Sequence, residues 1–236
     1  MKNVNWNAAH PLTEQGLTPG LTSGSSQSVL HVLRTARNLQ TAIDRPILRE
    51  HDLQVMWLAY RLACACEAVD LQTHDIEGHR GSLKPGSLSA EQVLWAGLLH
   101  DVGKHVLPEV ILAKPTPLTV DERQVMQTHS LHGYRIAAQL AEQHGISAID
   151  GVVLDGILHH HERFNGEGYP VGLIGESIPL LARVLAVVDV YVALTSHRPY
   201  RTAWTQRAAL DYLLAHQGTL FDPRIVQHAV RVFEYH

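Results

Sequence analysis

Apolar residues recur three and four positions apart over most of the chain, which is the pattern of amphipathic helices. Two such series lie in the first third, at Val29, Val32, Leu33, Ala36, Leu39 and Ile43, and at Leu53, Met56, Leu58, Tyr60 and Leu62. They predict helices over 28–44 and over about 47–69, separated by Pro46. Strict apolar–polar alternation, the pattern of a half-buried strand, competes nowhere in the sequence. We therefore predict an all-α fold without internal repeats.

Helix ends are marked by residues that satisfy free backbone groups. Ser89 with Gln92 and Thr119 with Glu122 have the spacing of capping boxes, which predict helices from about 90 to 101 and from about 120 to 143. Gly145 ends the second of these in the usual way. Three prolines between them keep 103–118 irregular, with one short helical turn.

The second half of the chain predicts four more helices. One over 147–161 leads into a glycine-rich loop, 162–178, after which Pro179 opens a strongly apolar helix. Thr202 or Thr205 starts the next helix, which runs to about 216. Asp222 as N-cap and Pro223 as first residue begin the last one.

Two segments lack apolar periodicity. Residues 1–27 are rich in Asn, Gly, Ser, Thr and Pro and predict a flexible leader, too short for a separate sensor domain. Residues 70–88 are polar and predict a loop. The remaining chain, 28–236, is long enough for one domain with a sizeable core. The helix over 28–44 could pack on this domain or pair with a partner, so the oligomeric state stays open.

Composition and charge narrow the classes of function. A net charge of −4 over 236 residues provides no basic field, so no nucleic acid polymer is expected as a partner. No run of 18 apolar residues predicts a membrane span, and the N-terminus has no apolar signal core. Cys64 and Cys66, two apart on a predicted helix, point in different directions and are poorly placed to form a disulfide. A reducing compartment, the cytoplasm, is the expected location.

The chain has 17 histidines, far more than a domain of this size needs for packing. His159, His160 and His161 are consecutive and run into a turn that contains Gly166 and Gly168. Neutral imidazole is the commonest protein ligand for first-row transition metals, and glycine lets a backbone approach a ligand closely. Consecutive residues on a helix point about 100° apart, so His160 and His161 would need a wide site or adjacent faces of one metal. The stretch 159–170 therefore indicates a metal site.

Other polar residues interrupt apolar helical faces. Asp189 stands among valines, where an ionised carboxylate must be paired, metal-bound or protonated. Singly, a histidine on an apolar face is more often a hydrogen-bonded core residue than a ligand. Together, the set has the composition of a two-metal site in a bundle core. Its members are His51, His100, Asp101, His129, His160, His161 and Asp189. Asp101 is the natural bridge, because the two oxygens of a carboxylate can bind two cations.

Three segments resemble the HD-GYP subfamily of the HD phosphohydrolase superfamily, and they stand in the family's order. They are Leu98–Lys104 with the signature pair His100-Asp101, His160–Pro170 with Gly168-Tyr169-Pro170, and Ala193–Arg201. The resemblance covers about 51–228, most of the chain. It implies an HD-domain helical bundle with a GYP loop, preceded here by an N-terminal helical extension.

The HD-GYP subfamily consists of bacterial phosphodiesterases that hydrolyse cyclic di-GMP. The resemblance therefore implies cyclic di-GMP as the substrate and two divalent metal ions as cofactors. One metal would be held by His51, His100, Asp101 and Asp189, and the other by Asp101, His129, His160 and His161. Iron and manganese suit these ligands best, and imidazole with carboxylate also allows zinc. GGDEF-type signalling proteins are further candidate partners.

The resemblance also implies roles around the substrate. Lys104 would contact a substrate phosphate and would be catalytic together with Asp101. Gly168 and Tyr169 would line the substrate pocket. Arg198 and Arg201 would grip phosphate oxygens, which suits the guanidinium fork. Two cations would lower the pKa of a bridging water, and the resulting hydroxide would attack phosphorus in line with the departing 3′ oxygen. The metals and cationic side chains would stabilise the transition state.

The sequence departs from the subfamily at several positions. Ile47 replaces a glutamate that some members use for a third metal, which favours two metals and the linear product pGpG over GMP. Val192 replaces an aspartate near the substrate, and Phe164 and Asn165 replace tryptophan and aspartate in the loop. His159 has no family counterpart, and we expect it on the helix surface or in support of a ligand.

These departures leave two other interpretations open. The chain could be a degenerate module that binds cyclic di-GMP or a protein without cleavage, or a phosphohydrolase for another nucleotide. The complete ligand set favours the enzyme over the module. The Gly168-Tyr169-Pro170 loop argues against another nucleotide.

Overall fold

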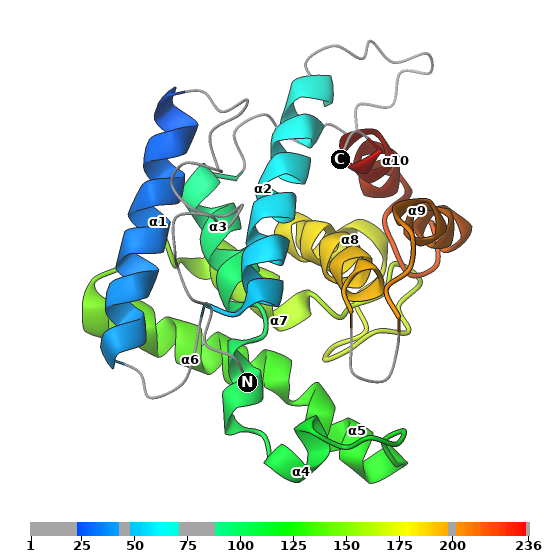
Figure 1. Cartoon of the computed structure of the whole chain (residues 1–236), viewed down its shortest axis with the longest axis horizontal. Helices are drawn as coiled ribbons and strands as arrows, with labels where there is room; N and C mark the ends of the chain where they lie inside the picture. Colours follow the sequence, from blue (N-terminus) through cyan, green and yellow to red (C-terminus); the bar gives the residue numbers. More distant parts are fainter. Residues whose placement is uncertain (1–22, 43–47, 71–87, 198–201, 235–236) are drawn as a thin grey trace.

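Helices make up the regular structure of the described residues, which are 23–42, 48–70, 88–197 and 202–234 of this computed structural model (Figure 1). The α-helices are α1 (Ser23–Ala42), α2 (Glu50–Asp70), α3 (Ala90–Leu99), α4 (Glu109–Leu112), α5 (Val120–Gln127), α6 (His129–His144), α7 (Gly151–His159), α8 (Leu180–Thr195), α9 (Gln206–Ala215) and α10 (Pro223–Phe233). Two short 3-10 helices are η1 (Val102–Val106) and η2 (Gly175–Ser177). Within these ranges the extended pairing is one isolated bridge, Gln217 to Phe221. The all-α prediction is confirmed.

Three helices, α2, α3 and α8, form the centre of the bundle. α2 packs along both α3 and α8, and α7 lies against α3 and α8 from the other side. α10 closes on α2 and α8, with α9 beside it (Figure 1). α1 packs on α3, so the helix predicted for 28–44 is part of the domain.

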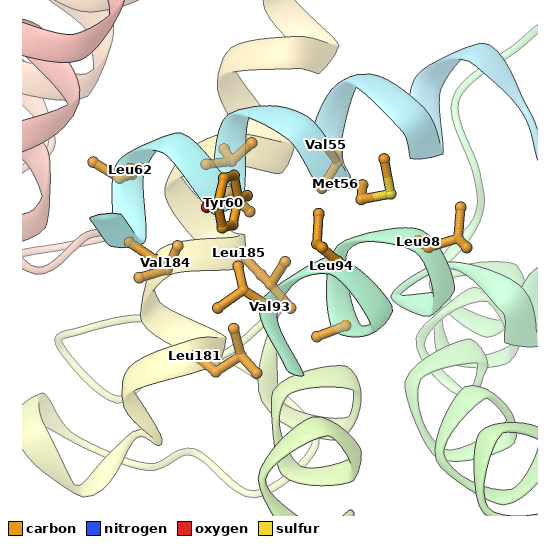
Figure 2. Packing of buried hydrophobic residues seen from close by; sticks show 14 of the residues in the cluster. Val55, Met56, Tyr60, Leu62, Val93, Leu94, Leu98, Leu181, Val184 and Leu185 are labelled. Carbon is orange, nitrogen blue, oxygen red and sulfur yellow. The ribbon is translucent and has the colours of Figure 1, made fainter. Parts of the chain in front are cut away.

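Interdigitated side chains hold these central helices together (Figure 2). Met56 from α2, Leu94 from α3 and Leu185 from α8 are 1%, 0% and 0% exposed. Every residue from Val93 to Leu99 is buried, because α3 is surrounded by other helices and is apolar on all its faces. Gly97 permits the close approach of α2, since a Cβ there would lie 2.5 Å from the Cα of Met56. This contact fixes the end of α3, which carries His100, against α2.

Both predicted capping boxes are present. The side chains of Ser89 and Thr119 accept the N–H three residues on, while those of Gln92 and Glu122 accept the N–H of the cap residue. Gly145, with φ of 64°, ends α6 in the left-handed conformation. The local sequence is therefore sufficient to place these helix ends.

The last two helices also begin where capping residues were expected. Thr205, rather than Thr202, caps α9 through the N–H of Ala208. Asp222 caps α10, and Pro223 is its first residue. Pro179 precedes the first residue of α8, as predicted.

The single helix predicted from about 120 to 143 is wrong, because the chain breaks at Thr128 between α5 and α6. The hydroxyl of Thr128 donates to the carbonyl of Val125 at 2.7 Å, and its N–H points at the carbonyls of Val125 and Met126. These contacts tighten the last turn of α5 and stop it from continuing. His129 thereby becomes the first residue of α6.

The helix predicted over 147–161 is shorter at both ends. α7 begins after Asp150, whose side chain accepts the N–H groups of Val152 and Val153. It ends at His159, with His160 as the C-cap. His160 and His161 therefore follow the last residue of the helix.

Several predictions fall outside the described residues. They are most of the leader (1–22), most of the loop (71–87), Ile47, Arg198 and Arg201. α1 itself begins at Ser23, before the predicted start at 28. None of the described helices combines the length and the apolar character that a membrane span requires.

Candidate metal centre

The seven residues predicted as metal ligands converge from five helical segments. His51 lies in the first turn of α2, His100 and Asp101 where α3 ends, His129 at the start of α6, His160 and His161 just after α7, and Asp189 within α8. Ring centroids of neighbouring histidines in this set are 4.1–5.5 Å apart. Residues far apart in the sequence thus form one cluster.

Three of the histidines are oriented by the backbone of their own turn. Nδ1 of His100, His129 and His160 lies 2.8, 2.7 and 2.7 Å from the carbonyl oxygen three residues earlier. A ring nitrogen that faces a carbonyl at this distance is a donor, so we assign a proton to Nδ1 in all three rings, which leaves Nε2 to face the cluster. Metal-bound histidines are commonly held in this way, with the second nitrogen fixed by a carbonyl.

Asp101 lies between two sets of ligand atoms. Its Oδ1 is 3.5 Å from Nε2 of His129, and its Oδ2 is 3.6 Å from Nε2 of His100. The two oxygens of one buried carboxylate therefore face different histidines, which is the arrangement that a bridging ligand needs.

The first set contains Asp101, His129, His160 and His161, with one ligand atom from each within 4.8 Å of the others. Nε2 of His129 is 3.1 Å from Nε2 of His161 and 3.5 Å from Nε2 of His160. Three ring nitrogens and one carboxylate oxygen that point at a common space can hold a transition metal.

The second set contains His51, Asp52, His100 and Asp101, again within 4.8 Å. Asp189 adjoins it, with Oδ1 3.1 Å from Nε2 of His51 and 3.8 Å from Nε2 of His100. The two sets share one residue, Asp101.

Burial keeps the imidazoles of the first set neutral. Desolvation lowers the pKa of His129, and desolvation with the neighbouring histidines holds that of His160 well below its ordinary value. Desolvation likewise lowers the pKa of His161 to about 3. Neutral imidazole is the form that binds metal, so these rings need lose no proton on binding.

The second set is more strongly charged. Burial opposes ionisation of Asp101, but Lys104 and His100 hold the pKa of that carboxyl well below its usual range. Burial also opposes ionisation of Asp189, yet the neighbouring imidazoles of His100 and His51 keep the pKa of this carboxyl well below its usual range. Burial alone would lower the pKa of His100, but Asp101 and Asp189 raise it to about 9.

Two buried atoms show that these residues fit a metal. Among the described residues, Nε2 of His100 and Oδ1 of Asp101 have no hydrogen-bond partner. Leaving such atoms unpaired inside a protein costs about 1–3 kcal/mol each, and more for a charged group. Divalent cations bound to both sets would satisfy these atoms, and the imidazole–carboxylate donors match iron, manganese or zinc.

Lys104 reaches the same carboxylate from η1. Its Nζ is 2.5 Å from Oδ2 of Asp101, and its side chain is 30% exposed. Burial opposes the charge on Lys104, but Asp101 and Asp189 raise its pKa, so it remains an ammonium. The ammonium group of Lys104 is thus held at the boundary between the cluster and solvent.

The loop after α7 is organised by Glu162, which is 3% exposed. Its carboxylate accepts the N–H groups of Val171, Gly172 and Leu173 at 2.8–3.2 Å. His159, which has no family counterpart, places Nδ1 3.4 Å from Oε1 of Glu162. His159 therefore supports the loop, through Glu162, and contributes no atom to either ligand set.

Tyr169 closes the loop over the cluster. Its ring stacks on His161 with centroids 4.9 Å apart, and its N–H donates to the carbonyl of His161 at 3.2 Å. Burial, with Asp101 and Asp189, raises the pKa of Tyr169, so the hydroxyl stays protonated. Gly168 packs directly on the backbone of Glu162 and Arg163, where a Cβ would not fit.

A cavity of about 610 Å³ opens beside His51. Its lining comes mainly from α2 and α8 and includes Trp57, Tyr191 and Val192. Val192 is 1% exposed, so the position where the subfamily has an aspartate contributes an apolar wall here. The cavity provides room for an organic group next to the cluster.

Three residues near the site were missed by the sequence reasoning. Asp52 belongs to the second ligand set, Arg49 pairs with Asp52, and Glu162 holds the loop. Asp52 follows His51 directly, but the apolar pattern of the sequence does not show whether this aspartate is buried or exposed. The predicted ligands are brought together, while their roles as ligands, and those of Lys104, Gly168 and Tyr169 toward substrate, stay predictions.

The described residues form an all-α bundle in which histidines and aspartates from separate helices make a cluster that could hold metal ions. The chain belongs to the HD domain family, whose model matches residues 80–225. The family predicted from the three motifs is confirmed.

Relatives of known name share much of this region. The chain is 47% identical over 147 residues to the cyclic di-GMP phosphodiesterase response regulator RpfG of Xanthomonas campestris pv. campestris, across 61% of this chain and 38% of the relative. It is 44% identical over 136 residues to the cyclic di-GMP phosphodiesterase PA4108 of Pseudomonas aeruginosa, across 58% and 31%. It is also 42% identical over 117 residues to the 3'3'-cGAMP-specific phosphodiesterase 1 of Vibrio cholerae, across 50% and 26%. The chain thus spans well under half the length of these relatives.

Two solved structures have the same fold. Bd1817, an HDG"Y"P protein from Bdellovibrio bacteriovorus, matches with a TM-score of 0.54 and 19% identity over 89% of this chain and 61% of that one. The cyclic GMP-AMP specific phosphodiesterase V-cGAP3 of Vibrio cholerae matches with a TM-score of 0.52 and 19% identity, over 88% and 48%. The HD-type helical fold predicted from the sequence is confirmed.

Proposed function

We propose that this chain is a metal-dependent phosphodiesterase that hydrolyses cyclic di-GMP to the linear dinucleotide pGpG. The observation that carries the proposal is the shared carboxylate: Asp101 belongs to two sets of ligands at once. Similarity to relatives named as cyclic di-GMP phosphodiesterases, at 44–47% identity, supports the substrate. The replacement of glutamate by Ile47 favours two metals and pGpG as the product.

Each metal would have its own ligands besides Asp101. His51, His100 and Asp189 would hold one, and His129, His160 and His161 the other. Iron or manganese is the better match, with zinc also compatible. When bound, such a pair supplies Lewis acidity and an activated water at neutral pH.

The chain's own groups would position and stabilise the substrate. Lys104, an ammonium at the solvent boundary of the cluster, would contact a phosphate oxygen and offset the charge that develops in the transition state. Tyr169, protonated and stacked on His161, would form one wall and offer a hydrogen-bond donor. The cavity beside His51 would accept a part of the dinucleotide away from the reacting phosphorus.

Arg198 and Arg201 are proposed to grip phosphate oxygens, on the strength of their match to the family motif. A cytoplasmic location and GGDEF-type partner proteins remain predictions from the sequence. A non-catalytic binding module, the alternative from the sequence, finds no support in the relatives, which are named as phosphodiesterases.

A second substrate has a specific observation in its favour. One relative at 42% identity is named for 3'3'-cGAMP, which differs from cyclic di-GMP in one purine base. The same metal site would serve either diester, so the choice depends on contacts to the base. Both dinucleotides belong in the assay.

The test is direct turnover. The protein is purified without oxygen, its metal content is measured, and it is incubated with cyclic di-GMP or 3'3'-cGAMP in the presence of Mn²⁺ or Fe²⁺. We expect pGpG from cyclic di-GMP and no product with Asp101→Ala. Tight binding without turnover would replace the proposal with a binding module. Turnover of unrelated phosphoesters alone would place the enzyme among other phosphohydrolases.

A further inference from the structure

Arg49 is a cation at the edge of the metal cluster that the family motifs do not include. It directly precedes α2, and its side chain is 30% exposed. Nε donates to Oδ2 of Asp52 at 2.6 Å, and Nη2 donates to Oδ1 at 2.9 Å. This two-pronged contact is the strongest geometry for an arginine and a carboxylate, and it fixes the plane of the guanidinium.

The carboxylate that holds Arg49 is itself part of the cluster. Asp52 is 2% exposed and belongs to the ligand set of His51, His100 and Asp101. Because both oxygens of Asp52 are occupied by Arg49, the carboxylate acts as a fixed anchor. Anchoring brings Nη2 of Arg49 to 3.9 Å from Oδ2 of Asp101, the oxygen that Lys104 also contacts.

Two cationic side chains therefore flank the same oxygen of the carboxylate that would bridge the metals. Lys104 approaches from η1, and Arg49 from the start of α2. A pair with Asp52 uses two of the five N–H donors of a guanidinium, so donors remain for another partner. An arginine serving only to neutralise Asp52 would need neither this exposure nor this nearness to Asp101.

Phosphate is the ligand that such a donor set recognises. Phosphodiester oxygens accept hydrogen bonds from guanidinium groups, and a cyclic dinucleotide carries two phosphodiesters. We propose that Arg49 is a substrate-binding residue that donates to a phosphate oxygen of the dinucleotide, and that Asp52 is the positioning residue that aims it. This inference rests on the proposed function and extends it to a residue outside the family motifs.

Four variants test the assignment: Arg49→Met, Arg49→Lys, Asp52→Asn and the double variant Arg49→Met/Asp52→Asn. Arg49→Met alone leaves the buried carboxylate of Asp52 unpaired, which could unfold the protein. The double variant removes both charges and avoids this penalty. The control is Arg207→Met, which breaks the exposed pair of Arg207 and Asp211 on α9. Metal content and thermal unfolding are measured for every variant.

The readouts are KM and kcat for cyclic di-GMP, and the Kd of inorganic phosphate for the Mn²⁺-loaded protein by calorimetry. Loss of a charge-assisted hydrogen bond predicts that Arg49→Met raises KM and the phosphate Kd roughly 10- to 100-fold, at unchanged metal content. Arg49→Lys, which keeps charge but loses the fork, should recover part of this. Asp52→Asn should weaken phosphate binding several-fold, and in the double variant it should add nothing to Arg49→Met. The control should match the wild type.

The outcomes separate the two proposals. If the wild-type protein binds metal but does not hydrolyse cyclic di-GMP, the proposed function is wrong. The phosphate Kd of the variants would then still test whether Arg49 binds phosphate. Unchanged KM and phosphate Kd in folded Arg49→Met would overturn the role of Arg49. A fall in metal content with Asp52→Asn would make Asp52 a ligand and overturn its role as a positioning residue.

Discussion

Replacement of Glu162 by glutamine is the sharpest test of how the loop over the cluster is held. Oε1 accepts the N–H of Val171 at 2.8 Å and that of Gly172 at 3.2 Å, while Oε2 accepts those of Gly172 and Leu173 at 3.0 and 3.1 Å. Glutamine keeps one oxygen and puts an NH₂ group in place of the other. That group is a donor and would face N–H groups that are donors themselves.

The structure sets the size of the effect. A hydrogen bond to a charged group contributes about 1.5–3 kcal/mol, and a buried donor left unpaired costs about 1–3 kcal/mol. Glu162→Gln removes the negative charge that all three N–H groups face. It also removes the only acceptor of one of them, Leu173 or Val171, while Gly172 keeps the remaining oxygen. We therefore expect the free energy of unfolding to fall by roughly 2–4 kcal/mol, since the loop can relax and recover part of the loss through water.

Guanidinium chloride unfolding, followed by circular dichroism on chelator-treated protein, measures this change without a contribution from bound metal. Glu167→Gln is the matched control, because Glu167 is an exposed glutamate of the same loop that contacts Asn165. The control should lose less than about 0.5 kcal/mol, as is usual for surface substitutions. If Glu162→Gln loses no more than the control, Glu162 does not organise the loop.

Three other predictions follow from the site and the core. Asp101→Asn should lower binding of both metals, whereas Asp189→Asn should lower binding of one; equal stoichiometry in the two variants, by elemental analysis, would rule out Asp101 as the bridge. Leu94→Ala, at a residue that is 0% exposed, should destabilise the protein by about 2–5 kcal/mol in chemical unfolding, and a loss below 1 kcal/mol would contradict the packing described. Because the pKa of His100 is raised to about 9 in the folded metal-free protein, its stabilising contribution is complete below pH 6.5 and lost as pH rises to 9. His100→Gln should remove this part of the pH dependence in unfolding measurements between pH 6.5 and 9, and an unchanged slope would show that His100 is not its source.

Much of the helical framework was predictable because the signals are local. A capping box at Ser89 requires only the side chain of Gln92 three residues later, and Gly145 ends α6 through its own φ of 64°. The break at Thr128 was missed for the opposite reason. Threonine is tolerated in helices, and its hydroxyl ends α5 through a contact with Val125 that the apolar pattern does not encode.

The candidate metal ligands were predictable from the sequence, whereas the residues that hold those ligands and the loop in place were not. Asp189 was predicted as a ligand because a carboxylate within an apolar helix needs a partner. Arg49 and Asp52 were not predicted, because an oppositely charged pair three residues apart at a helix start is common in sequences. The short distance from Arg49 to Asp101 exists only in the folded structure. Glu162 lies inside the recognised motif, yet its role depends on N–H groups that the loop turns back toward it.

The sequence by itself determined most of the helices and which residue types are present to bind metal, since helix periodicity and capping act over a few neighbours. Only the tertiary structure decided that Oδ1 and Oδ2 of Asp101 face different histidines, and that His160 and His161 both approach Nε2 of His129. The physical reason is that a binding geometry depends on packing between helices distant in the chain. Gly97 against Met56 is one such contact, and no local pattern records it.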